Sequence, residues 1–130
     1  MAKRQEAQGR TLRSIIELED GKRILVKVKA IRETDGEYKG HLIDCDTMSG
    51  DHFSINGHTI LVDKLSSLYT FGNDWFDIFR DGKIGRAVNY RVERVEGSDE
   101  ALSNDPEEQQ LITWTNEYVS SQIAALPPRD

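Results

Sequence analysis

The segment HLIDCDTMSGDHFSING, residues 41–57, contains two of the three histidines, the single cysteine and three aspartates. Residues of these types are the usual ligands of protein metal sites, but the segment also has the pattern of two strands joined by a turn. If it folds as a hairpin about its Ser-Gly turn, Cys45 lies near Phe53 and Asp46 lies near His52. The possible ligands are then spread along the hairpin, so we expect two strands here and no metal site.

Strand-like patterns continue on the N-terminal side of this segment. Two runs rich in β-branched residues flank Asp20-Gly21, a dipeptide that favours a type I′ hairpin turn. The second run alternates apolar and polar residues, which predicts a half-buried strand whose wet face carries Lys27 and Lys29. The first run, 11–19, either adds an extra strand or forms half of a long bent strand. After a further turn, a strand is expected from about 38 to 46.

On the C-terminal side the hydrophobic period changes. Residues 58–69 have helical spacing, which predicts a helix that ends before a Gly-Asn-Asp break. The run WFDIF then predicts a strand that places Trp75 and Phe79 on the same face. A loop is expected at 81–85, followed by a last strand at 87–95.

Composition divides the chain into four predicted segments. Residues 1–10 are expected to form a flexible arm, 11–96 a barrel, 97–104 a polar linker and 105–126 an acidic amphipathic helix.

The predicted C-terminal helix has a clear start, because Asp105 can act as N-cap and Pro106 takes the first helical position. Leu111, Trp114 and Tyr118 lie on its apolar face and would be a large exposed patch if left free. We therefore expect these three residues to bind a protein partner, a second subunit or the chain's own barrel. The helix is alternatively interpreted as a mimic of nucleic acid that competes for a basic face.

The order of the predicted elements indicates a mainly β protein. Three strands in a meander, a helix and two further strands follow the order of the oligonucleotide/oligosaccharide-binding barrel, or OB fold, whose helix lies between the third and fourth strands. With the extra N-terminal run, we expect an OB-fold-like small barrel of five or six strands and an added C-terminal helix.

Residues 15–96 also resemble the small barrel proteins of bacteriophages that are related to single-stranded-DNA-binding proteins. The shared features are an acidic-Gly turn before the first long strand, Ser49-Gly50-Asp51, Gly57, Leu61 and Leu65 in the helix, Phe76-x-Ile78, Gly82-Lys83 and Tyr90. The resemblance implies an OB fold that binds single-stranded DNA in phage replication or recombination. Asn56 and Arg80 stand at two positions where the resemblance leads us to expect aromatic residues.

The net charge of −6 is unevenly distributed. Residues 1–40 carry ten Lys/Arg and seven Asp/Glu, residues 41–96 carry six and nine, and residues 97–130 carry one and seven. The acidic total argues against a protein that coats duplex phosphates nonspecifically. It is compatible with a barrel that has one basic face and a separate acidic segment.

Proteins that bind single strands combine cations with aromatic faces on which bases stack. The expected phosphate contacts are Lys27, Lys29, Lys39, Arg80, Lys83 and Arg86, and the expected stacking residues are Tyr38, Trp75 and Phe79. Two alternatives remain open for this set. First, lysines at alternating positions are also typical of the solvent-exposed face of a sheet. Second, the C-terminal helix needs a surface on which to pack, and Trp75 and Phe79 would provide it.

A different class of function is the alternative to DNA binding. An OB-like barrel without nucleic-acid binding would be a phage protein-interaction module, such as an inhibitor or assembly factor, and the acidic total favours this. The sequence has no Gly-rich phosphate loop, Cys-x-x-Cys pair, nucleophile elbow or His-Glu-x-x-His motif, so we expect neither an enzyme nor a cofactor. The single cysteine and the absence of a signal peptide or long apolar run predict a cytoplasmic protein.

Overall fold

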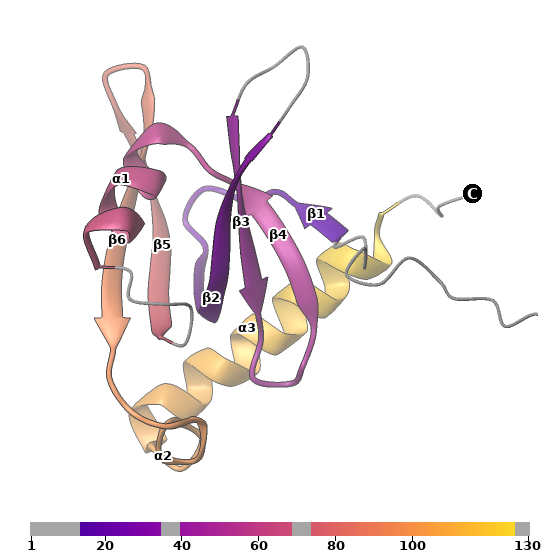
Figure 1. The fold of residues 1–130 in the computed structure, drawn as a ribbon. Helices are drawn as coiled ribbons and strands as arrows, with labels where there is room; N and C mark the ends of the chain where they lie inside the picture. The colour runs from indigo at the N-terminus through magenta and orange to yellow at the C-terminus, as the bar shows by residue number, and fades with distance from the viewer. Residues whose placement is uncertain (1–13, 35–39, 69–73, 127–130) are drawn as a thin grey trace, which may run out of the picture.

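One six-stranded sheet carries the fold, with the strand order β1-β4-β3-β2-β5-β6 (Figure 1). The structure is a computed structural model that describes residues 14–34, 40–68 and 74–126. Its elements are β1 (Ser14–Ile16), β2 (Arg23–Thr34), β3 (Gly40–Asp46), β4 (His52–Asn56), α1 (Thr59–Leu68), β5 (Trp75–Ile84), β6 (Ala87–Val95), α2 (Asp99–Ser103) and α3 (Pro106–Ala124). The chain is therefore mainly β, and within the described residues no pairing joins the edge strands β1 and β6.

The segment 41–57 forms the hairpin that its pattern predicts. Strands β3 and β4 pair antiparallel, with Cys45 opposite Phe53 and Asp46 opposite His52. Because side chains alternate across a strand, Cys45 and Phe53 point into the core and are fully buried. Asp44 and Asp46 therefore lie on the opposite face of β3, with Ser54 and His52 opposite them in β4.

Strand β2 is shared by two neighbours. Its N-terminal half, Arg23 to Lys27, pairs antiparallel with β5, whereas Lys27 to Thr34 pair antiparallel with β3. The predicted period of two is confirmed on the inner face, where Ile24, Val26 and Val28 are fully buried. Leu25 lies on the opposite face and is also buried, because α3 covers that part of the strand.

The predicted hairpin at Asp20-Gly21 is wrong. Strand β1 pairs parallel with β4, with Ile16 opposite Ile55, and so becomes the extra strand at the edge of the sheet. Gly21 adopts a φ of 81°, and its N–H donates to the carbonyl of Arg80, so the chain turns onto β5. The physical reason is burial. Pairing with β4 places Ile16 in the hydrophobic core, whereas an isolated hairpin with β2 would not bury this side chain.

Helix α1 matches its predicted range of 58–69 to within one residue at each end. Leu61 and Leu65 project into the core, and the helix packs against β6. Gly57 precedes the helix where its backbone passes close to β3. A Cβ built at Gly57 would lie 2.7 Å from the Cβ of His41 and 2.9 Å from its carbonyl oxygen, so only glycine fits here.

The connection between β5 and β6 is shorter than predicted. Residues 81–84 were expected in a loop, but β5 continues to Ile84 and only Gly85 and Arg86 form the turn. The pairing of β5 with β6 shifts register between Arg80 and Lys83, so the ladder accommodates an irregularity without ending. Local composition does not reveal that cross-strand hydrogen bonds extend the ladder through a Gly-containing run.

The segment 97–104, predicted to be a polar linker, contains α2, so that prediction is wrong. The Ser98 side chain caps the helix by accepting from the N–H of Ala101, and Leu102 is buried. Helix α3 then begins as predicted, with the Asp105 carboxylate accepting from the N–H of Glu107. Leu102 packs in one cluster with Leu25 and Trp75, so α2 is part of the C-terminal cover of the sheet.

Helix α3 docks on its own sheet and runs obliquely from α2 toward β1 (Figure 1). Its N-terminal part places Leu111 and Ile112 against Leu25 and Trp75 on the outer face of the sheet. Farther along, Val119 reaches the main core and is fully buried. No helix in the described ranges is both long and apolar enough to cross a membrane.

Candidate functional site

Trp75 does not provide an exposed stacking face, so this prediction is wrong. The residue is 3% exposed beneath α2 and α3, and its indole N–H donates to Asp99 Oδ1 at 2.7 Å. Lys27 Nζ lies 5.3 Å from the indole centroid and 3.1 Å from Asp99. The hydrogen bond from Trp75 is the main cause that lowers the pKa of Asp99, with Lys27 adding to it. Docking of the C-terminal helices therefore removes both Trp75 and Lys27 from the expected DNA face.

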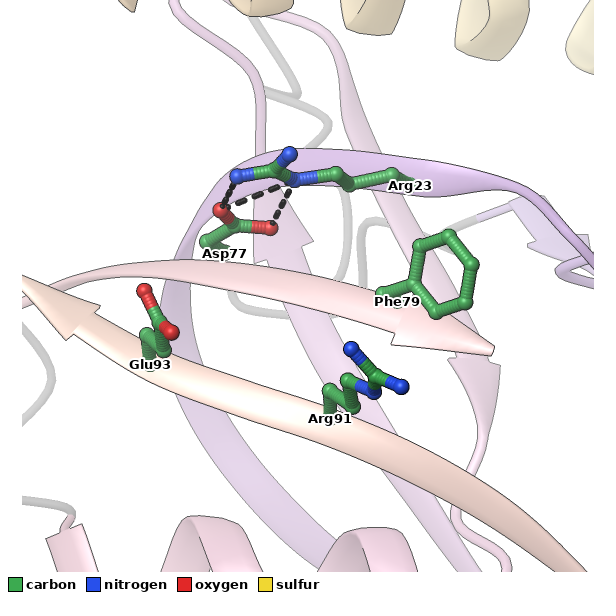
Figure 2. A pocket seen from close by; sticks show the side chains of 5 residues that line it. All are labelled: Arg23, Asp77, Phe79, Arg91 and Glu93. Atoms are coloured by element: carbon green, nitrogen blue, oxygen red, sulfur yellow. Dashed lines mark hydrogen bonds and ion pairs between the residues drawn. The ribbon is translucent and has the colours of Figure 1, made fainter. Parts of the chain in front are cut away.

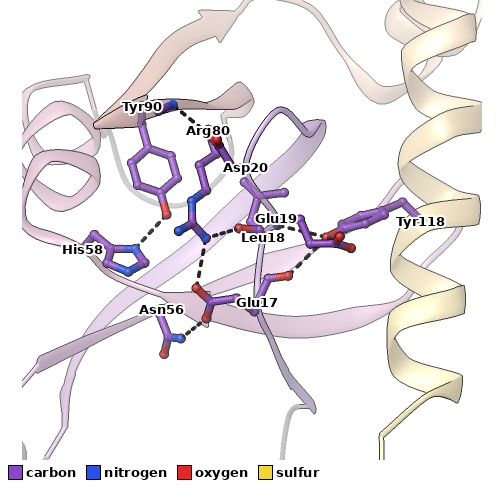
Figure 3. A network of polar contacts seen from close by, with 10 residues as sticks. Glu17, Leu18, Glu19, Asp20, Asn56, His58, Arg80, Tyr90 and Tyr118 are labelled. Carbon is purple, nitrogen blue, oxygen red and sulfur yellow. Dashed lines mark hydrogen bonds and ion pairs between the residues drawn. The ribbon is translucent and has the colours of Figure 1, made fainter. Parts of the chain in front are cut away.

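Arg80 is also occupied within the protein. Its Nη1 lies 3.1 Å from Glu17 Oε1 and donates to the carbonyl oxygen of Leu18 at 2.5 Å (Figure 3). Asn56, at the other position where a ring was expected, donates from its amide to Glu17. These contacts tie β5 and β4 to the segment after β1, so both residues have structural partners.

The same network reaches α3 and His58, the residue that precedes α1 (Figure 3). The Tyr118 hydroxyl accepts from the N–H of Glu19 at 3.1 Å and donates to the carbonyl of Glu17, which fixes α3 against this segment (Figure 3). Nearby, His58 Nδ1 lies 2.7 Å from the Tyr90 hydroxyl. Burial raises the pKa of Tyr90 to about 12, so this hydroxyl stays protonated at neutral pH.

Of the remaining expected phosphate contacts, the structure describes Lys29, Lys83 and Arg86. Lys29 is exposed on β2, close enough to Asp99 for a Coulombic interaction. Lys83 and Arg86 are exposed at the β5–β6 turn, beside Ile84, which is 61% exposed. Neither of these two cations forms an ion pair within the described part of the chain. The expected contacts Tyr38 and Lys39 lie outside the described residues.

Phe79 lies partly exposed in a hollow on the outer face of β2, β5 and β6. The hollow has a volume of about 220 Å³ and is lined by Arg23, Asp77, Phe79, Arg91 and Glu93 (Figure 2). Arg91 Cζ lies 6.0 Å from the Phe79 ring centroid. Arg23 donates to both carboxylate oxygens of Asp77, an interaction that raises the pKa of the guanidinium. The lining of the hollow thus contains one cation–carboxylate pair, Arg23 with Asp77, and one cation–aromatic pair, Arg91 with Phe79.

The three apolar residues predicted on α3 do not form a single surface. Leu111 is buried against the sheet, Tyr118 is partly buried, and Trp114 is 56% exposed. Trp114 lines a hollow of about 510 Å³ that Phe79 also borders, so a ring from α3 and a ring from β5 share this space.

Arg23, Arg91 and Glu93 were not among the predicted site residues. Strand alternation could have found them, because Arg23 pairs with Phe79 in β5, and Phe79 pairs with Arg91 in β6. Directly opposed residues of neighbouring strands point to the same face of a sheet. What the sequence does not reveal is which part of this face α3 leaves uncovered.

The segment 41–57 does not assemble a metal site in the described part of the chain. Asp44 accepts two hydrogen bonds from Arg32, at 2.7 and 2.9 Å, and one from the Ser54 hydroxyl at 2.6 Å. Asp46 lies 2.7 Å from His52 Nδ1. The described ranges contain no group of three or more His, Cys, Asp or Glu residues placed to hold a metal ion.

Comparison with known proteins yields no match to a family model, to a curated protein or to a solved structure.

Proposed function

We propose that the protein binds single-stranded DNA through an OB-type barrel, in phage DNA replication or recombination in the host cytoplasm. The element order supports an OB-type barrel, because three meandering strands, a helix and two strands follow one another. Strand β2 pairs with β3 over one half and with β5 over the other, as the long first strand of such a barrel does.

The observation that carries the proposal is the exposed cationic turn between β5 and β6. Most described cations already have a carboxylate partner, as Lys27 has in Asp99 and Arg91 has in Asp81. A phosphate would have to displace those carboxylates. Lys83 and Arg86 form no ion pair with the described residues, so they can bind a phosphate without first losing a carboxylate partner. The loop between the last two strands is also one that OB barrels use for ligand.

Phe79 extends this surface along β5. Its ring is partly exposed, and a base that stacks there would contribute roughly 1–3 kcal/mol. Lys29 on β2 is a further exposed cation of the expected set. The proposed DNA-contacting residues are therefore Lys29, Phe79, Lys83 and Arg86.

Titration of labelled oligo-dT at several salt concentrations tests the proposal. Each cation that neutralises a phosphate of a single strand contributes about 0.7 to the slope of log K against log salt. The variants Lys83→Ala and Arg86→Ala should each weaken binding and reduce this slope by about that amount.

Arg94→Ala is the matched control, because Arg94 is a part-exposed cation of β6 that already has Glu96 at 3.6 Å. It should leave the slope nearly unchanged. The proposal is wrong if the wild-type protein binds oligo-dT no better than millimolar, if binding is independent of salt, or if Arg94→Ala changes the slope as much as Lys83→Ala.

A further inference from the structure

A groove lies between α3 and the outer face of the sheet, and we call it the α3 groove. It consists of three hollows of about 220, 510 and 220 Å³ that all border Arg23. Phe79 lines two of them from β5, and Trp114 lines two from α3. Figure 2 shows the strand side of this groove, where Phe79 and Arg91 approach each other. The groove therefore offers two partly exposed aromatic rings on opposing elements.

Trp114 is not needed to attach α3 to the sheet. The attachment is made by Leu111, Ile112, Thr115 and Val119, which are buried, whereas 56% of Trp114 remains exposed. Tryptophan is among the residues that are most enriched at the energetic centres of protein interfaces. An exposed tryptophan beside a hollow is thus suited to anchor an apolar side chain or a cation of a partner.

Charge decides which partner the groove fits. The cations that line it have contacts within the protein: Lys22 lies over the Tyr118 ring, Arg23 binds Asp77, and Arg91 binds Asp81. Four glutamates also line the groove, namely Glu93, Glu107, Glu108 and Glu117. In the described part of the chain, none of these glutamates forms an ion pair.

The acidic side is densest near the start of α3. Burial raises the pKa of Glu108, and the neighbouring carboxylates Asp105 and Asp77 raise it further. These carboxylates are close enough to repel one another, so a cation placed among them is favoured. The phosphates of a nucleic acid would be repelled from the same position.

We propose that the α3 groove binds a basic and apolar peptide segment of a protein partner. Trp114 and Phe79 contact its apolar side chains or cover its Lys and Arg side chains. Glu107, Glu108 and Glu117 pair with its positive charges. Lys83 and Arg86 do not line the groove, and only Phe79 is shared with the surface proposed to bind DNA, so the inference does not require DNA binding.

The two tryptophans provide a direct test by NMR. Each contributes one indole N–H signal, and Trp114→Phe assigns them because it removes only one. Adding a short synthetic peptide of alternating Arg or Lys and Leu should shift the Trp114 signal and leave that of the buried Trp75 nearly unchanged. A peptide in which Glu and Asp replace the basic residues is the control, and it should bind at least about tenfold more weakly.

Variants separate anchoring from general damage. Trp114→Ala should weaken the basic peptide about tenfold or more, as expected for a tryptophan anchor, whereas Trp114→Phe keeps a ring and should weaken it less. Glu107→Gln combined with Glu108→Gln should weaken binding severalfold and reduce its salt dependence. Since these side chains are not fully buried, the variants should fold, and the Trp75 signal reports whether they do.

Four results would overturn the proposal. Equal binding of the basic and acidic peptides, or equal binding by wild type and Trp114→Ala, removes the groove as the site. A shift of the Trp114 signal by oligo-dT but not by the basic peptide assigns the groove to nucleic acid. A shift that depends on protein concentration alone assigns it to a second copy of the chain.

Discussion

The Thr115 hydroxyl on α3 accepts a hydrogen bond from the backbone N–H of Leu25 at 2.9 Å, in a fully buried position. This N–H lies in the half of β2 that β3 does not reach, because the pairing of β2 with β3 begins at Lys27. Helix α3 thus supplies the acceptor that a neighbouring strand would otherwise provide. Replacing Thr115 by Val keeps the shape of the side chain but removes the acceptor.

The cost of Thr115→Val follows from the orphaned N–H. A buried donor without a partner costs about 1–3 kcal/mol, and a value near the middle should lower Tm by roughly 6–10 °C in a domain of this size. Urea unfolding followed by tryptophan fluorescence measures the free energy of unfolding. Hydrogen exchange at the Leu25 amide adds a local readout and should become faster in the variant.

Thr113→Val is the matched control, since Thr113 is exposed on the same helix and undergoes the same change in helix propensity. It should change the free energy of unfolding by less than about 0.5 kcal/mol. If Thr115→Val is no more destabilising than Thr113→Val, and Leu25 exchange is unchanged, α3 does not complete the hydrogen bonding of β2 and the description of its docking is wrong.

Two further perturbations test the fold. Gly57→Ala places a Cβ 2.7 Å from that of His41 and should lower the free energy of unfolding by about 1–3 kcal/mol. Gly40→Ala is the control and should be tolerated, because its Cβ meets its nearest atom at 3.7 Å. Equal effects of the two substitutions would contradict the close approach at Gly57. Asp99→Asn should destabilise the protein at pH 7, because the folded-state pKa of Asp99 lies below its ordinary value of 3.8. The stability that ionised Asp99 contributes is present above its ordinary pKa and is lost as pH falls through its folded-state pKa. The unfolding midpoints of wild type and variant should therefore converge below pH 3.8. A difference that stays constant with pH would rule out a role of Asp99 ionisation.

Local patterns in the chain predict most of the elements. Alternation of apolar residues predicts the inner face of β2 and the register of β3 with β4, where Cys45 faces Phe53. Helical spacing predicts α1, and the cap at Asp105 predicts where α3 begins. These features succeed because each depends on neighbours within a few residues, namely side-chain period, turn chemistry and capping.

The candidate site depends on contacts between distant segments, and there prediction is incomplete. Trp75 and Phe79 share one face by alternation, yet α2 and α3 cover Trp75 and leave Phe79 partly exposed. The sequence contains the five acidic and aromatic residues of α3 that line the groove, but it does not show that Trp114 turns away from the sheet while Leu111 turns toward it.

The sequence by itself thus determined the order of the strands, α1 and α3, the inner faces of the strands and the excess of acid in the C-terminal segment. Only the tertiary structure decided that β1 pairs with β4, that Asp99 binds Trp75 and Lys27, and that α3 completes β2. The reason is physical. Strand period and caps are local preferences, whereas burial and polar pairing are set by which distant surfaces reach each other when the chain packs.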